Sequence, residues 1–319
     1  MSLTPTVEQI EAVAKKIQPH VLRTPTIAYS GVPIAGLEDA SVFIKLELLQ
    51  HGGSFKARGV FNALLSLPDT SNAVTAFSAG NHAIAVAYAS HKCGVSAKVV
   101  MPKSANPFRV ERVRYWGAEI VFGDTMSDLV SIVEQLQRDE KRVLIHPYEG
   151  IHTIEGTATV GYELCMDVES LDAIIIPVGG GGLIAGVACA VKQLQPAAKV
   201  IGVEPTQACG MATSIKNGAP LEKVALNSIA DSLSAPMHFP LSYSFSERYV
   251  DRFVQVTDEQ IRQAMRFMFT ELKLAVEPAC AAALAALQGP LLENMAGKRV
   301  GLLACGSNVD RQTYNNLLA

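Results

Sequence analysis

The chain has no closely spaced pair of cysteines. Its six cysteines lie far apart in mostly apolar segments, and none belongs to a C-x-x-C motif. This spacing excludes the common zinc-binding patterns and the disulfide framework of small secreted proteins. The N-terminal segment also lacks the form of a signal peptide, so we expect a reducing, cytoplasmic location.

An excess of one charge and long apolar runs are also missing. The 319 residues carry 27 Lys and Arg against 30 Asp and Glu, which gives a net charge of −3 with the two signs mixed. This balance gives no basic surface for nucleic acid, and the apolar runs are too short to cross a membrane. We therefore expect a small-molecule substrate, with neither nucleic acid nor a membrane as partner.

Strand and helix patterns alternate along the chain. The strand-like runs are 42–48, 73–77, 97–101, 119–122, 142–145 and 173–178. The helical patterns between them are 54–67, 80–92, 107–116 and 126–138. This alternation predicts an α/β fold with mostly parallel sheets. The block 69–149 has the pattern of a separate βαβαβα unit.

Lys56 stands at the start of one predicted helix. It lies in Gly53-Ser54-Phe55-Lys56-Ala57-Arg58-Gly59, after a strand pattern, with Ser54 as the expected N-cap. The helix dipole and any burial both disfavour a positive charge there, so they lower the pKa of the amine. Such a lysine is a nucleophile suited to a Schiff base with an aldehyde cofactor. The pattern also fits a surface lysine on an amphipathic helix.

A glycine-rich segment joins the strand pattern 173–178 to an apolar helix. Its residues are Gly179, Gly180, Gly181, Gly182 and Leu183. The loop exposes backbone N–H groups at a helix N-terminus and predicts a phosphate site. A tight turn that needs positive φ is the plainer alternative.

The same segment also satisfies a second motif. Gly180 to Ala185 reads G-x-G-x-x-A, and Glu204 ends the next strand pattern, where an acidic residue would hold a ribose. A dinucleotide site therefore competes with the phosphate site. It gives no role to Gly179 and leaves Lys56 unexplained.

Two further segments follow strand patterns. Ser78-Ala79-Gly80-Asn81-His82 opens a helix, and its small residues would expose N–H donors suited to a carboxylate. Asn81 can donate to or accept from a phenolic oxygen, whereas we assign His82 no proton transfer. Cys305 follows the strand pattern 300–303 and would face the binding crevice of an open α/β sheet, although a plain buried cysteine is the usual case.

Taken in order, these segments resemble the pyridoxal-phosphate enzymes of the tryptophan synthase β (fold type II) group. The similarity extends from Arg23 to Asn308 and is greatest to the serine/threonine dehydratases, to which serine racemase is related. It implies two open, twisted, mostly parallel sheet domains. A small mobile domain at 69–149 would be inserted in a large cofactor-binding domain formed by 1–68 and 150–319. The site would lie in the cleft between them.

The resemblance also implies a role for each motif residue. Lys56 would carry pyridoxal 5'-phosphate as a Schiff base, and Phe55 would pack on its ring. Asn81 would bond the ring hydroxyl, and Cys305 would lie at the pyridine nitrogen. The phosphate would be held by Gly179, Gly180, Gly181, Gly182 and Leu183. The substrate would be held by Ser78, Ala79, Gly80, Asn81 and His82.

Some positions distinguish the subfamilies. Serine racemases carry a second serine where this chain has Ala79, and that serine reprotonates the α-carbon. Alanine has no proton to give. The segments 276–280 and 305–308 resemble the liver-type serine dehydratase, including its cysteine at the ring nitrogen. A thiol partner leaves that nitrogen largely unprotonated, which suits elimination of a β-substituent.

Other positions depart from the family pattern. His51-Gly52-Gly53 replaces the usual Pro-Thr-Gly, and 154–157 reads Ile-Glu-Gly-Thr where many members have Gly-Gln-Gly-Thr. No arginine occurs in 124–129, where some relatives have one near the substrate. These differences concern the substrate rather than the cofactor.

The cation site of the relatives would fall on Glu204 and the carbonyls of Ala208 and Gly210. Racemase-like members have a carboxylate at the last of these positions, which Gly210 cannot supply. We therefore expect at most a monovalent cation there.

The hypothesis is a pyridoxal-phosphate ammonia-lyase that converts a 3-hydroxy amino acid, such as L-serine or L-threonine, to a 2-keto acid and ammonia. Lys56, displaced by the substrate amine, would take the α-proton. We expect a homodimer. The alternatives are a serine racemase or another fold type II lyase and, from other classes, an NAD-linked oxidoreductase or a phospholigand-binding protein.

Overall fold

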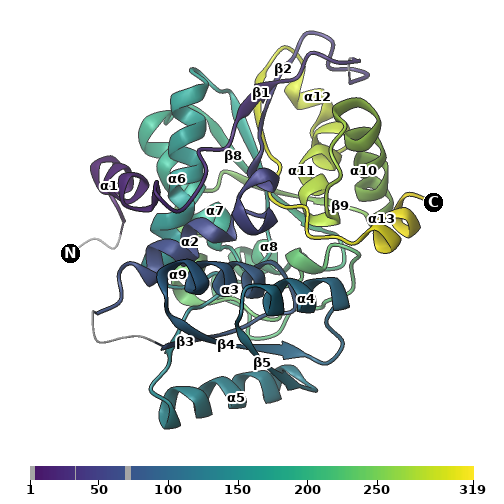
Figure 1. Cartoon of the computed structure of the whole chain (residues 1–319). Helices are drawn as coiled ribbons and strands as arrows, with labels where there is room; N and C mark the ends of the chain where they lie inside the picture. Colours follow the sequence, from purple (N-terminus) through teal and green to yellow (C-terminus); the bar gives the residue numbers. More distant parts are fainter. Residues whose placement is uncertain (1–3, 33, 69–72) are drawn as a thin grey trace.

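Two sheets organise the chain (Figure 1). The computed structural model describes residues 4–32, 34–68 and 73–319. A six-stranded sheet has the order β1-β2-β10-β7-β8-β9, and a four-stranded sheet has the order β5-β4-β3-β6. All neighbouring strands are parallel except β1 and β2. The predicted α/β class with two mostly parallel sheets is confirmed.

Most element bounds lie within two residues of the sequence patterns, but the strand predicted at 42–48 ends at Lys45 and is followed by a 3-10 helix (Glu47–Leu49), and the helix predicted to reach residue 67 ends at Leu64. The larger sheet consists of β1 (Thr26–Ala28), β2 (Ser41–Lys45), β7 (Ala173–Pro177), β8 (Lys199–Pro205), β9 (Arg252–Val256) and β10 (Arg299–Leu303). The smaller sheet consists of β3 (Ala73–Phe77), β4 (Ser96–Pro102), β5 (Glu119–Gly123) and β6 (Val143–Leu144). The helices are α1 (Val7–Ile17), α2 (Lys56–Leu64), α3 (Asn81–Cys93), α4 (Pro107–Tyr115), α5 (Met126–Asp139), α6 (Ile151–Asp167), α7 (Gly182–Leu194), α8 (Gly210–Asn217), α9 (Pro240–Tyr249), α10 (Asp258–Leu272), α11 (Pro278–Gln288), α12 (Leu292–Met295) and α13 (Arg311–Leu318).

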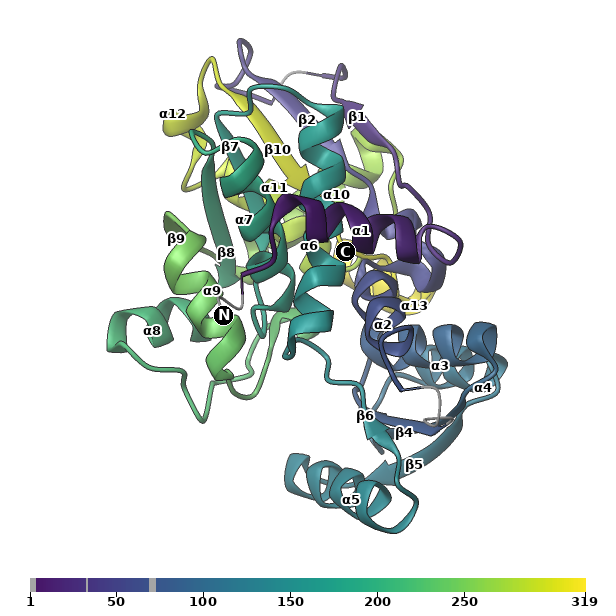
Figure 2. The same cartoon turned by 90° about the vertical axis from the view of Figure 1, so that its left-hand side faces the viewer.

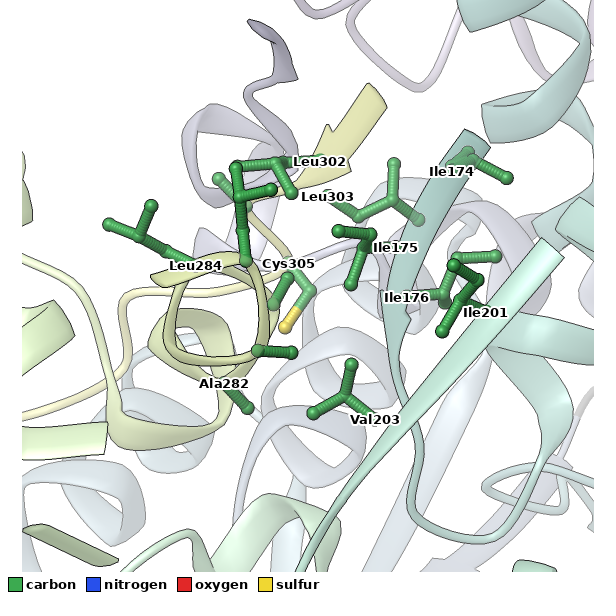
Figure 3. Packing of buried hydrophobic residues seen from close by; sticks show 14 of the residues in the cluster. Ile174, Ile175, Ile176, Ile201, Val203, Ala282, Leu284, Leu302, Leu303 and Cys305 are labelled. Carbon is green, nitrogen blue, oxygen red and sulfur yellow. The ribbon is translucent and has the colours of Figure 1, made fainter. Parts of the chain in front are cut away.

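Helices cover both faces of each sheet. Figure 2 shows α6 and α7 in front of the larger sheet, with α10 and α11 behind it. In the smaller sheet, α3 and α4 lie on one side and α5 on the other. This layering explains why β7 is apolar throughout rather than alternating, since a parallel strand covered on both faces meets no solvent. Figure 3 shows Ile174, Ile175 and Ile176 of β7 beside β8, close to α11.

α2 and α6 pack with their backbones in close contact. A Cβ on Gly156 would lie 2.5 Å from the Arg58 carbonyl oxygen, and a Cβ on Gly59 would lie 3.1 Å from the Thr153 carbonyl oxygen. A side chain at Gly156 would therefore force the two helices apart. The contact fixes the position of α2, which carries Lys56.

A buried charge network links Arg58 of α2 to the neighbouring helix α6. The Arg58 guanidinium donates to the carboxylates of Glu47 and Glu163, with four N···O distances of 2.8 Å. Lys45 Nζ donates to Glu163 at 2.7 Å. Two basic and two acidic side chains thus neutralise one another in the protein interior, as buried charges require.

The predicted domain division remains a prediction. β3 to β6 and the helices α3 to α5 all fall within the predicted small domain at 69–149. The first boundary, at 68/69, borders residues 69–72, which lie outside the described residues.

Candidate active site

The carboxyl ends of strands from both sheets border one pocket of about 210 Å³. Its walls come from the start of α2 and from the turns after β3, β7 and β10. Ligands of open α/β sheets bind at this edge. The pocket brings together all the predicted cofactor and substrate residues. These are Phe55, Lys56, Ser78, Ala79, Gly80, Asn81, His82, Gly179, Gly180, Gly181, Gly182, Leu183 and Cys305.

α2 begins later than the sequence predicts. Its N-cap is Phe55, and Lys56 is its first helical residue. Ser54, the predicted N-cap, instead pairs with Gly306 in an isolated β-bridge, and its buried hydroxyl has no hydrogen-bond partner. The prediction for Ser54 is wrong because a contact distant in sequence holds its backbone extended. Lys56 nevertheless lies in the first turn of the helix.

Lys56 forms no ion pair with any described residue. Its Nζ donates a hydrogen bond to the Pro147 carbonyl and lies 5.1 Å from the centre of the Phe55 ring. Burial lowers the pKa of Lys56 to about 8, and nearby Cys305 and Glu277 oppose this shift only in part. A useful fraction of the amine is therefore uncharged near neutral pH, as a nucleophile requires.

The loop from Gly179 to Leu183 offers free donors. Gly181 is the N-cap of α7 and has a φ of 92°, a left-handed conformation that favours glycine. Among the described residues, none accepts a hydrogen bond from the backbone N–H groups of this loop. Unpaired N–H groups at a helix N-terminus bind anions such as phosphate.

Asn81 is held in one orientation by its neighbours. Its Oδ1 accepts a hydrogen bond from Asn308 at 2.7 Å, and its Nδ2 donates to Glu277 Oε1 at 2.6 Å. Asn308 Nδ2 also donates to the Gly52 carbonyl at 2.7 Å, which fixes the Asn308 amide, so the Asn81 atom that faces it must be the accepting oxygen and the Asn81 amide cannot flip. Its second N–H makes only a long hydrogen bond, to Ser232 Oγ at 3.5 Å, which a phenolic oxygen in the pocket could replace.

Cys305 directly follows β10 and is buried. In Figure 3 its sulfur lies beside Ala282 of α11. A side-chain hydrogen bond with Cys280 and burial raise the pKa of the Cys305 thiol well above its ordinary value. The group is therefore a neutral thiol at physiological pH.

The segment after β3 contains no titrating acid or base. His82 Nε2 donates to the Ile145 carbonyl at 2.8 Å, and burial and the charge of Lys56 lower the pKa of His82 to about 3. Ala79 presents only a methyl group. Ser78 Oγ accepts a hydrogen bond from the Gly80 N–H at 3.1 Å.

Glu204 and Ala208 do not line this pocket. The two Glu204 carboxylate oxygens accept hydrogen bonds from the N–H groups of Met211 (2.7 Å) and Ala212 (2.9 Å) at the start of α8. Burial raises the pKa of Glu204 to about 7. Since both oxygens face α8, Glu204 does not face a ribose beside the glycine loop, and the structure gives no support to a dinucleotide site. The described ranges contain no group of three His, Cys, Asp or Glu side chains suited to a metal ion.

The pocket also contains charged residues that sequence reasoning missed. Glu277 is fully buried, its Oε2 has no hydrogen-bond partner, and burial raises its pKa to about 7. Arg109 of α4 forms an ion pair with Asp231. The position of Glu277 directly before the first residue of α11, a proline, was the only local signal for it. Arg109 lies in an ordinary charged helix and gave no signal.

The chemistry of these groups fits pyridoxal phosphate. The amine of Lys56 suits the aldehyde, and the free N–H groups of the glycine loop suit the phosphate. Asn81 offers an N–H to the ring hydroxyl, and Cys305 offers a neutral partner to the ring nitrogen. A family described as pyridoxal-phosphate dependent enzymes matches residues 17–306. The chain belongs to this family.

Several members of the family are similar to this pyridoxal-phosphate enzyme over nearly its whole length. Phenylserine dehydratase of Ralstonia pickettii is 46% identical over 313 residues, which cover 97% of this chain and 95% of that protein. L-threonine ammonia-lyase of Thermotoga maritima is 33% identical over 98% of this chain and 78% of its own length. The structure of maize serine racemase has a TM-score of 0.90 at 33% identity and covers 98% of this chain and 96% of its own.

No helix within residues 4–32, 34–68 and 73–319 has the length and apolar character needed to cross a membrane.

Proposed function

We propose that this pyridoxal-phosphate enzyme is an ammonia-lyase that removes the β-hydroxyl of a 3-hydroxy amino acid. The observation that carries the proposal is a single pocket in which an unpaired lysine meets a loop of free N–H groups, next to a segment whose Ala79 carries no proton donor. When bound, pyridoxal phosphate would withdraw electrons from the substrate and make its α-proton acidic. All other steps fall to side chains of the protein.

Lys56 is the base in this proposal. Its pKa of about 8 allows Nζ to accept the α-proton near neutral pH. The Pro147 carbonyl, which accepts a hydrogen bond from Nζ, orients the amine. Loss of the α-proton and the β-hydroxyl from the substrate gives water and an unsaturated amine, which hydrolyses to a 2-keto acid and ammonia.

The ring contacts favour elimination over racemisation. Cys305 would face the ring nitrogen as a neutral thiol, which keeps the electron withdrawal moderate. Racemisation, the alternative activity, needs a proton donor on the second face of the α-carbon. In the racemase pattern a serine supplies it, and this chain has the methyl group of Ala79 at that position.

The side of the pocket near β3 supports an apolar β-substituent. Phe77, Met126 and Tyr148 all line it. His146 extends this aromatic surface, since its ring lies 5.6 Å from that of Phe77 and 4.8 Å from that of Tyr148. The name of the Ralstonia relative, phenylserine dehydratase, agrees with such a wall. We therefore place phenylserine beside L-serine and L-threonine as a substrate.

Purified holoenzyme tests the proposal directly. It should show the visible absorbance of a lysine-bound cofactor, which borohydride bleaches. Each of the three amino acids should be offered, with 2-keto acid, ammonia and the opposite enantiomer measured in the same reaction. Release of 2-keto acid and ammonia in equal amounts supports the lyase. Enantiomer without 2-keto acid would identify a racemase instead.

We further propose that residues 69–149 form a small mobile domain inserted in a large one formed by 1–68 and 150–319. The separate four-stranded sheet supports this division. Small-angle scattering with and without substrate should show compaction if the smaller sheet closes on the larger one.

We also propose a cytoplasmic homodimer. The six cysteines are all unpaired, which suits a reducing compartment. Light scattering on the purified protein measures the oligomeric state, and fractionation of the source cells measures location.

A monovalent cation at Glu204 and Ala208 is a separate proposal. Replacing potassium by a large organic cation should then weaken cofactor binding.

A further inference from the structure

The guanidinium of Arg109 is held rigidly at the pocket. The side chain is 8% exposed, and its Nε donates to the Asn308 carbonyl at 3.0 Å. A Cβ on Gly80 would lie 3.1 Å from Arg109 Nη1, so the guanidinium lies against the segment after β3. Arg109 and that segment therefore face the same part of the pocket.

Its partner Asp231 is held far less firmly. Both Nη atoms of Arg109 contact the Asp231 carboxylate, one of them at 3.2 Å. The side chain of Asp231 is nevertheless 57% exposed. The other contact of its carboxylate is with the Ser232 hydroxyl, at 3.3 Å. An exposed carboxylate on a buried guanidinium can be exchanged for another carboxylate at little cost, because water solvates the one that leaves.

The pocket offers few positive charges for an amino-acid substrate. Of the described residues that line it, Lys56 and Arg109 are the only lysine or arginine. Lys56 is committed to the cofactor and the α-proton. Arginine presents paired N–H groups that match the two oxygens of a carboxylate, which makes it the better anchor for a carboxylate than a lysine.

We propose that Arg109 binds the α-carboxylate of the substrate, which replaces Asp231 on the guanidinium. The inference rests on the proposed function and adds a charged partner for the carboxylate to the N–H donors of the segment from Ser78 to His82, against which Arg109 lies. Glu277 Oε2, 3.9 Å from Arg109 Nη2, remains beside the guanidinium in both states. Displaced Asp231 would turn to solvent, so it acts as an internal competitor of the substrate.

Two small ligands that differ by a carboxylate test this assignment. L-alanine and ethylamine both offer an amine but no β-hydroxyl, so each can bind the holoenzyme without turnover. Affinity is read from the change in cofactor absorbance on titration. Arg109→Gln should weaken the binding of L-alanine by about ten- to hundredfold, since it removes charge-assisted hydrogen bonds. The affinity for ethylamine should change by less than about threefold, because ethylamine has no carboxylate for Arg109 to bind.

Three further variants keep the test sharp. Asp231→Asn should tighten the binding of L-alanine by about two- to fivefold, since it removes the charge of the carboxylate that competes for Arg109. Arg109→Lys keeps the charge but loses the paired donors, so it should give an intermediate loss. Arg114→Gln, on the exposed side of the same helix, should change the affinity for neither ligand, because within the described part of the chain its charge pairs only with Glu111, outside the pocket.

The outcomes separate the inference from the function on which it rests. Equal weakening of L-alanine and ethylamine in Arg109→Gln would show a purely structural role and overturn the assignment. So would unchanged L-alanine affinity in folded Arg109→Gln and Arg109→Lys. If the unmutated holoenzyme binds no amino acid at all, the proposed function fails first. The enzyme could turn over 3-hydroxy amino acids while Arg109→Gln weakens the binding of L-alanine and ethylamine equally. That result would support the proposed function and reject only the role of Arg109.

Discussion

The two sides of α2 hold basic side chains in opposite ways. Arg58 and Lys56 are two residues apart, so they point about 200° apart around the helix. Arg58 meets Glu47 and Glu163 in the interior, where these carboxylates outweigh the effect of burial and raise its pKa. Lys56 meets a carbonyl and an aromatic ring, and burial lowers its pKa to about 8.

The difference lies in the pairing rather than in the composition. The buried network around Arg58 and the described residues that line the pocket each contain two basic and two acidic side chains. The network has Lys45, Arg58, Glu47 and Glu163, and the pocket has Lys56, Arg109, Asp231 and Glu277. In the network every charge has a partner, and the result is structural. In the pocket Lys56 has a carbonyl but no carboxylate as its partner, and one oxygen of Glu277 accepts no hydrogen bond, so these groups remain available for chemistry. Perturbed groups of this kind gather at active sites.

Lys56→Ala should have the largest effect on function. We expect turnover to fall by at least about 10⁴-fold, because the variant lacks both the nucleophile and the base. The visible absorbance of the bound cofactor should disappear while circular dichroism stays unchanged. A pyridoxyl label found on Lys45 or another lysine after borohydride reduction of the parent enzyme would contradict the assignment.

Arg58→Met should have the largest effect on stability. Removing Arg58 leaves the buried carboxylate of Glu47 without a cation and Glu163 with Lys45 alone, and we expect a loss of about 3–5 kcal/mol in the free energy of unfolding. Denaturant titration of the cofactor-free protein measures it. Lys56→Met is the matched control on the same helix, and it should leave stability unchanged or raise it. Equal losses of unfolding free energy in both variants would show that the two sides of α2 do not differ in how they hold a basic side chain.

Glu277→Gln should change stability only at higher pH. Burial raises the pKa of Glu277 from 4.5 to about 7, so the folded protein favours the protonated acid. Its contribution to stability is present below pH 4.5 and is lost as the pH rises through 7. The glutamine variant should therefore match the parent near pH 4.5 and exceed it above pH 7, by on the order of 3 kcal/mol. Denaturant titrations of the cofactor-free proteins at both ends of this range measure the difference.

Ala79→Ser should give the smallest of these effects. A hydroxyl at this position adds a proton donor, and we expect the racemisation of serine to rise by about tenfold while elimination continues. Chiral analysis of residual substrate measures it, with Ala79→Gly as the control that adds no hydroxyl. Rapid formation of D-serine by the unmutated enzyme would show that another residue already supplies the proton.

Local patterns predicted much of the fold and part of the site. β3 has the predicted bounds, and α4 ends one residue before the prediction. Strand ends gave the positions of Asn81, Cys305 and the glycine loop. Long-range contacts could not be predicted in this way. Asn81 and Glu277 lie 196 residues apart, and no periodicity links them. Ser54 fails as an N-cap for the same reason, because a distant strand end sets its backbone.

The glycine contact between α2 and α6 has a consequence for hydrogen exchange. Helices whose backbones touch cannot open independently, so the amides of α2 should exchange only through global unfolding. We therefore expect the backbone that carries Lys56 to stay in place during catalysis, so that only its side chain moves. If the proposed small domain moves, the amides of α3 and α4 on the other wall of the pocket should exchange faster than those of α2 and should slow when substrate binds.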